Sequence, residues 1–76
     1  MPQAQIQMTP RRINDTTSII DIKGEITAFA ENVLMDAYSQ ASSAATRNII
    51  LNFAGLEYMN SSGIGLLVTL LIRMNR

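Results

Sequence analysis

An alternation of isoleucines with charged residues predicts a strand over residues 16–26. A period of two places the two kinds of side chain on opposite faces of the strand. One face carries Ile20, Ile22 and Ile26, and the other carries Asp21, Lys23 and Glu25. Gly24 interrupts the apolar face, which indicates a bulge or a close backbone approach. Residues 1–14 are weakly patterned. Their Pro10 cannot donate to a ladder, so a strand there fits only a sheet edge or a break.

Helical spacing of apolar residues predicts a helix over residues 28–43. Its buried stripe is Ala30, Val33, Leu34, Ala37, Tyr38 and Ala41. Thr27 suits the N-cap, and Glu31 lies favourably in the first turn. Residues 48–53 are almost continuously apolar, which is typical of a strand covered on both faces and reached by a β-α-β crossover. We expect a loop over residues 54–60.

Residues 61–75 predict a second helix that is apolar on most of its sides. Its main stripe is Ile64, Leu67, Leu70, Leu71 and Met74, and it is broadened by Leu66, Val68 and Ile72. A helix of this kind needs cover on most of its surface. We therefore expect the chain to self-associate through this helix, as a homo-oligomer, or to lack C-terminal elements that would cover it.

Composition narrows the function classes. With 76 residues the chain has room for a single domain, residues 1–76. It contains no cysteine and no histidine, so it offers no disulfide and no thiolate or imidazole metal ligand. Six basic residues, scattered along the chain, balance six acidic ones, whereas nucleic-acid binding needs clustered positive charge.

The longest apolar stretch, residues 63–72, is far shorter than the roughly 20 residues of a membrane span. We expect a cytoplasmic protein with no membrane insertion, no nucleic-acid partner and no cofactor.

Three polar residues join the buried strand to the apolar helix, and they are Asn60, Ser61 and Ser62. All three are favoured N-cap types, so capping alone would explain them. A helix start also carries unpaired N–H groups and partial positive charge, which suit an anion such as a phosphate on a serine there.

Residues 50–67, with Tyr58-Met59-Asn60-Ser61-Ser62-Gly63 at their centre, resemble the signature of the STAS family, the sulfate-transporter and anti-sigma factor antagonist domain. The segment Gly24-Glu25-Ile26 is similar to the end of that family's second strand. The elements predicted from the pattern run in the order β-β-α-β-α. With the resemblance they imply an α/β fold with a mixed sheet and helices packed on one side. Family members usually continue past the motif helix with another strand and one or two helices, so we expect this domain to be truncated at its C-terminus.

The resemblance to antagonist members implies a phosphorylatable interaction module. By position, Ser61 is the acceptor, with Ser62 as the second candidate. The implied partners are an anti-sigma factor serine kinase, which binds the unphosphorylated protein, and a serine phosphatase, which removes the phosphate and so restores binding. The family motif commonly opens with aspartate, whereas this chain has Asn60, which can cap the helix but lacks the charge. The expected binding face comprises Gly24, Glu25, Thr27, Tyr58, Met59, Asn60, Ser61, Ser62 and Gly63.

Two alternatives remain open. The first is a STAS scaffold or regulatory domain that oligomerises or acts on a transporter or sensor without a phosphoswitch. The second is a small enzyme or ligand-binding domain. Ser61 and Ser62 lack a histidine base, and no cofactor motif is complete, so we expect no enzyme activity.

Overall fold

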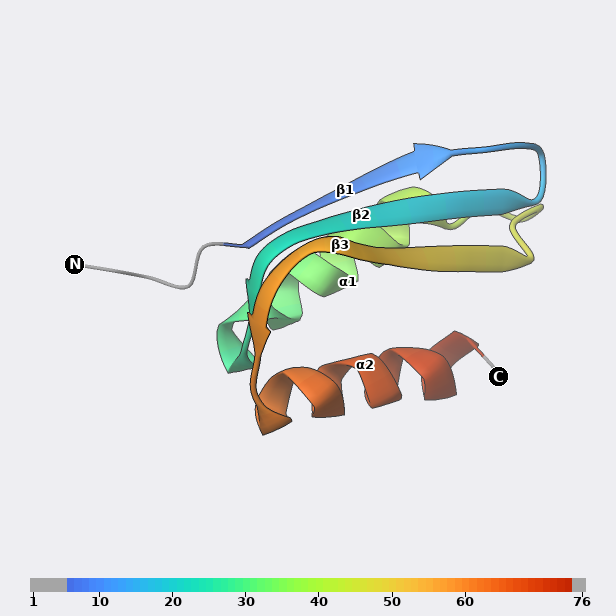
Figure 1. Ribbon diagram of the computed structural model, residues 1–76. Coiled ribbons are helices and arrows are strands. Elements are labelled where there is room, and N and C mark those ends of the chain that lie inside the picture. Colours follow the sequence, from blue (N-terminus) through green and yellow to red (C-terminus); the bar gives the residue numbers. More distant parts are fainter. Residues whose placement is uncertain (1–5, 75–76) are drawn as a thin grey trace.

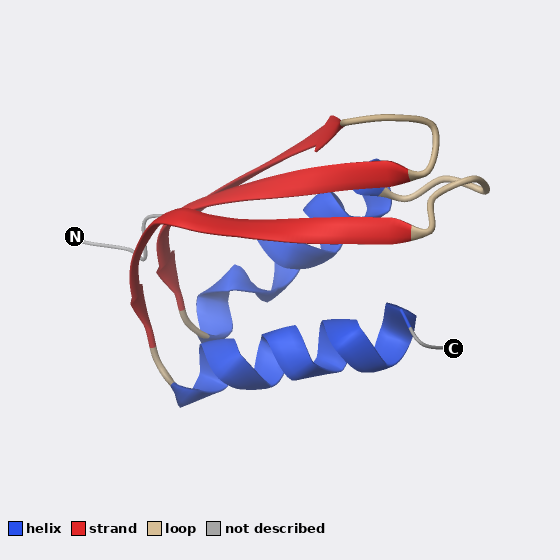
Figure 2. Cartoon of the chain, turned by 45° about the vertical axis from the view of Figure 1, so that its right-hand side comes forward, coloured by secondary structure: helices blue, strands red, loops and turns tan. Residues whose placement is uncertain are grey.

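A three-stranded sheet with two helices on one of its sides makes up the fold (Figures 1 and 2). The computed structural model describes residues 6–74. In chain order the elements are β1 (Ile6–Arg12), β2 (Thr17–Ile26), the 3-10 turn η1 (Ala28–Ala30), α1 (Glu31–Ala41), β3 (Asn48–Met59) and α2 (Ser61–Met74). The predicted α/β class and the order β-β-α-β-α are confirmed.

The sheet is mixed, in the order β1-β2-β3. β2 pairs antiparallel with β1 and parallel with β3, as a helical crossover between β2 and β3 requires. The strand predicted over residues 16–26 is confirmed, and its isoleucines face the core because Ile20, Ile22 and Ile26 are at most 2% exposed. Pro10 lies opposite Ile20 on the edge strand β1, so its missing N–H removes no hydrogen bond from the interior of the sheet.

The predicted first helix begins as a tighter turn and ends earlier than expected. Residues 28–30 form η1, and the α-helix proper covers Glu31–Ala41 rather than extending to residue 43. Thr27 does act as an N-cap, but for η1, where its hydroxyl accepts the Phe29 N–H at 3.3 Å. The helix stops because Ser42 adopts an extended backbone, and the Ser42 N–H closes the last turn on the Tyr38 carbonyl.

A buried serine ties the end of α1 to the sheet. The Ser18 hydroxyl, in a side chain only 2% exposed, donates to the Ala41 carbonyl at 2.8 Å. That carbonyl belongs to the last turn of α1 and has no intrahelical donor. Ser18 therefore satisfies a helix-end acceptor from the core face of β2.

Residues 54–60 were expected to form a loop, and this expectation was wrong. β3 continues to Met59, with two bulges that disturb its alternation. Between Asp21 and Lys23 of β2 the partner strand gains one residue, since Asn52 pairs with Asp21 and Gly55 with Lys23. A second residue is gained between Leu56 and Tyr58. Each bulge shifts the strand by one position, so the period of two breaks although pairing continues.

Neither β3 nor α2 is covered as fully as the sequence suggested. β3 was expected to be buried on both faces, but Ile50 is exposed because no helix of the described residues covers the outer face of the sheet, and Phe53, in the first bulge, is exposed as well. On α2, Leu70 is buried and Leu66 packs against the core. Among the residues of α2 whose burial is described, the exposed large apolar ones are Ile64, Val68, Leu71 and Ile72. The predicted stripe is thus divided between an inner and an outer side of the helix.

Candidate functional site

Asn60 is the N-cap of α2. Its side-chain oxygen accepts the Gly63 N–H at 3.0 Å, and its carbonyl accepts the Ile64 N–H at 3.1 Å as the first helical bond. Three residues of the motif could have capped the helix, and the hydrogen bonds show that Asn60 does so. Ser61 and Ser62 then occupy the first two helical positions, and both are exposed. Their hydroxyls lie at the positive end of the helix, on the surface.

Gly63 holds the start of α2 against the end of β2. A Cβ atom built at Gly63 would lie 2.4 Å from the Ile26 carbonyl oxygen and 2.9 Å from the Ile26 carbonyl carbon. The Asn60 N–H also donates to the Ile26 carbonyl oxygen, at 3.2 Å. Only a residue without a side chain allows this approach. Gly65 is different, since a Cβ there would meet no atom within 4 Å.

Gly24 creates the bend that brings the strand end to this position. Its φ of 102° lies in the region that favours glycine, and the register between β2 and β3 shifts directly after it. The irregularity expected at Gly24 is therefore present, although the extra residue of the bulge lies on β3. β2 and β3 curl toward the helices at their carboxyl ends, and β3 leads through Asn60 into α2 (Figure 1).

The residues expected to contact a partner fall into two groups. Tyr58, Ser61 and Ser62 are exposed, and Glu25, Thr27, Met59 and Asn60 are half-buried. Gly24 and Gly63 are buried and present no side chain, so they shape the site rather than form its surface. Glu25 pairs with Tyr58, and Ile26 with Met59, which brings the two strand ends together beside the start of α2.

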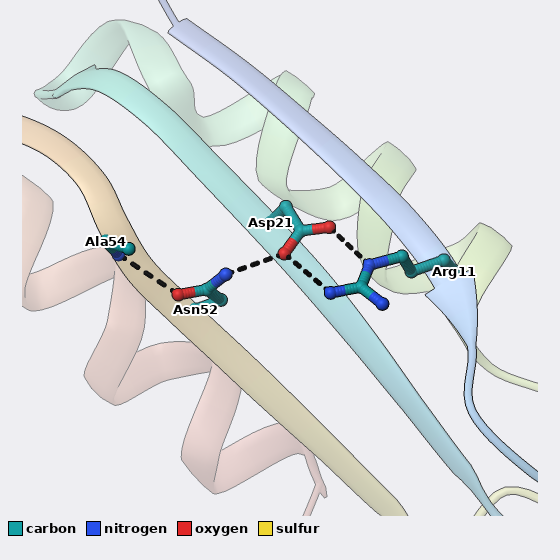
Figure 3. Close-up of polar contacts among 4 residues, drawn as sticks. All are labelled: Arg11, Asp21, Asn52 and Ala54. Carbon is teal, nitrogen blue, oxygen red and sulfur yellow. Dashed lines mark hydrogen bonds and ion pairs between the residues drawn. The ribbon is translucent and has the colours of Figure 1, made fainter.

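A polar cluster crosses the outer face of the sheet, with one residue from each strand (Figure 3). Arg11 donates to Asp21 from Nε at 2.6 Å and from Nη2 at 3.4 Å, and the Asn52 amide donates to Asp21 at 2.8 Å. These hydrogen bonds, chiefly the one from Arg11 and then the one from Asn52, hold the pKa of the Asp21 carboxyl below its usual range. The pattern predicted only that Asp21 faces outward. Its partners depend on the strand register.

Asn52 connects this cluster to the first bulge of β3. Its side-chain oxygen accepts the Ala54 N–H at 3.1 Å, two residues further along. Ala54 is one of the two residues between the Asn52 and Gly55 pairs, where the ladder is irregular. The side chain therefore replaces a ladder bond at the place where β3 begins to curl toward the candidate site.

Within residues 6–74, no group of three or more acidic residues forms a cluster that could hold a metal ion. No helix in that part of the chain is long and apolar enough to cross a membrane. The arrangement at the start of α2 instead offers exposed hydroxyls, a capped helix end and flanking strand ends.

The mixed sheet, the two helices on one side and the capped serine pair at the second helix define a small α/β domain of a recognisable kind. A family model described as STAS domain matches residues 8–76. The chain belongs to the STAS domain family, as its motif and strand order indicated. A comparison with curated proteins finds no match to the chain.

Proposed function

We propose that this STAS domain is an anti-sigma factor antagonist. In its unphosphorylated form it binds an anti-sigma factor that is also a serine kinase, and phosphorylation of Ser61 ends that binding. A serine phosphatase resets the cycle. The role is protein–protein interaction in the cytoplasm rather than catalysis. The observation that carries the proposal is the exposed Ser61 hydroxyl in the first turn of a helix whose start is fixed to the core through Gly63.

The position of Ser61 suits a modification that changes binding without unfolding the domain. A phosphoserine adds about 1.5 to 2 negative charges at pH 7. The first turn of a helix tolerates such charge, because its free N–H groups and dipole favour an anion. The same phosphate would disrupt a docked partner, through repulsion of acidic groups or the loss of solvation in an apolar interface.

Asn60 gives the site a cap without charge. Because the amide oxygen already accepts the Gly63 N–H, the helix start is formed as it would be with the aspartate that is common in the family. Asparagine removes the charge of that aspartate but keeps the capped helix start at which Ser61 is exposed. We therefore retain Ser61 as the acceptor and Ser62 as the second candidate.

The test is phosphorylation by purified anti-sigma factor kinases from the organism that encodes the chain. The full chain is incubated with each kinase and ATP, and peptides are mapped by mass spectrometry. We expect a single phosphoryl group on Ser61 that is absent from Ser61→Ala and retained in Ser62→Ala. Failure of every kinase to modify either serine would refute the phosphoswitch.

A second candidate function is a scaffold that oligomerises without phosphorylation. It is favoured by the apolar residues on the outer side of α2, where Ile64, Leu71 and Ile72 are each more than half exposed. Covering this surface with a second copy would remove it from water. Sedimentation separates the candidates, since a scaffold predicts a concentration-dependent oligomer that Leu71→Glu dissolves, and a stable monomer at high concentration contradicts it.

A further inference from the structure

Phe29 is the most exposed large apolar side chain described in this domain, at 82%. The backbone holds it outward. Thr27 accepts two N–H groups of the turn, that of Phe29 with its hydroxyl and that of Ala30 with its carbonyl. Ala30 is fully buried, and a 3-10 turn separates neighbouring side chains by about a third of a turn. Burying Ala30 therefore directs Phe29 to the surface.

Phe29 lies at the same end of the molecule as Ser61. The turn η1 contacts α2, and the two segments adjoin in Figure 2. The carbonyl of Ile26, three residues before Phe29, accepts the N–H of Asn60, the residue before Ser61. A second exposed aromatic residue, Tyr58, stands two residues before Asn60 at 53% exposure. Two exposed aromatic residues thus lie on the two segments that meet at the start of α2.

The charges around this surface indicate what can occupy it. Residues 24–31 and 56–66 contain the acidic residues Glu25, Glu31 and Glu57 and no lysine or arginine. The nearest basic residue along the chain is Lys23, on the outer face of β2. Two copies of this end would bring like charges together, and an anionic membrane or nucleic acid would be repelled. A different protein with basic groups around an apolar pocket is complementary to it.

We propose that Phe29 is an apolar anchor that enters a pocket of the protein partner, with basic residues of that partner at the rim facing Glu25, Glu31 and Glu57. The proposal rests on the function assigned to Ser61, and it names a further contact with the same partner. Aromatic side chains that fill a desolvated pocket dominate many interfaces.

The test compares Phe29→Ala with Ile72→Ala, which removes an equally apolar, 59% exposed side chain from the far part of α2. Binding of each full-length variant to the anti-sigma factor kinase that modifies Ser61 is measured by calorimetry. We expect the dissociation constant to rise about tenfold or more for Phe29→Ala and less than about twofold for Ile72→Ala. Urea midpoints equal to the wild-type value would show that both variants fold.

The outcomes separate the two proposals. If the wild-type chain binds the kinase and Phe29→Ala binds it equally tightly, Phe29 is not an anchor, and the proposed phosphoswitch is unaffected. Equal losses in both variants also overturn it, because the contact would then not be specific to this end. If no such kinase binds the wild-type chain, the proposed function fails and the anchor fails with it.

Discussion

Replacing Gly63 by alanine tests how the candidate site is held in place. The new Cβ would lie 2.4 Å from the Ile26 carbonyl oxygen and 2.8 Å from Cγ2 of the same residue. Because two of the three nearest atoms are backbone, the overlap is relieved only if α2 moves away from β2. Overpacking of this kind costs typically about 1 to 3 kcal/mol. A shift also stretches the Asn60 to Ile26 hydrogen bond, which is worth about 1 kcal/mol.

Gly65 supplies a matched control in the same helix. A Cβ there meets nothing within 4 Å, so Gly65→Ala gains the helix propensity of alanine, about 0.8 to 1 kcal/mol, without a clash. Gly63→Ala gains no more than this from propensity. The two variants should therefore differ in unfolding free energy by at least about 2 kcal/mol, in favour of Gly65→Ala.

Thermal unfolding followed by circular dichroism, at one protein concentration for all variants, measures the difference. For a domain of this size, 2 kcal/mol corresponds to at least about 8 °C in the melting temperature. We expect Gly65→Ala to melt above the wild type and Gly63→Ala below it. Equal melting temperatures, or a Gly63→Ala protein more stable than the wild type, would refute the close approach of α2 to Ile26.

Three further predictions follow from the polar contacts. Asn60→Ala should lower the unfolding free energy by about 1 kcal/mol, whereas Asn60→Asp keeps the N-cap and should leave the unfolding free energy unchanged. A urea titration in which Asn60→Ala is as stable as Asn60→Asp would contradict the capping role of Asn60. Hydrogen bonds from Arg11 and Asn52 lower the pKa of Asp21 in the folded protein. The ionised carboxylate should therefore stabilise the fold at pH values above its unfolded pKa of about 4, and this stabilisation should be lost as the pH falls through the lower, folded pKa. Asp21→Asn should flatten the acid limb of the unfolding curve, and an unchanged limb refutes the assignment. Asn52→Ala should speed hydrogen exchange at the Ala54 amide while core amides of β2 stay protected, and unchanged exchange at Ala54 contradicts the bulge contact.

The parts of the fold that depend on local patterns were predictable. The isoleucines of β2 alternate with charged residues, and the run of N-cap types from Asn60 to Ser62 marks the start of α2. Both signals lie within a few residues of the features they predict. The motif around Ser61 also allowed the family to be inferred, since its strand, cap and helix are contiguous in the chain.

What escaped prediction depends on pairing between distant segments. The end of β3 resembled a loop because two extra residues break its alternation, and the strand partners that keep it extended lie about 30 positions earlier. The cluster of Arg11, Asp21 and Asn52 likewise requires the register of all three strands. Ala30 belonged to the predicted buried stripe and is buried, whereas the exposure of Phe29, two residues after the N-cap Thr27, depends on the 3-10 turn.

Affinity and stability measured together on the phosphorylated protein test the central claim most directly. The anti-sigma factor kinase is titrated, without ATP, with unmodified protein and with protein carrying phosphate on Ser61, and both forms are melted. We predict a dissociation constant at least about tenfold higher for the phosphorylated form, with a melting temperature close to that of the unmodified form. Equal affinities, or a phosphorylated protein that no longer folds, would contradict a surface switch at the start of α2.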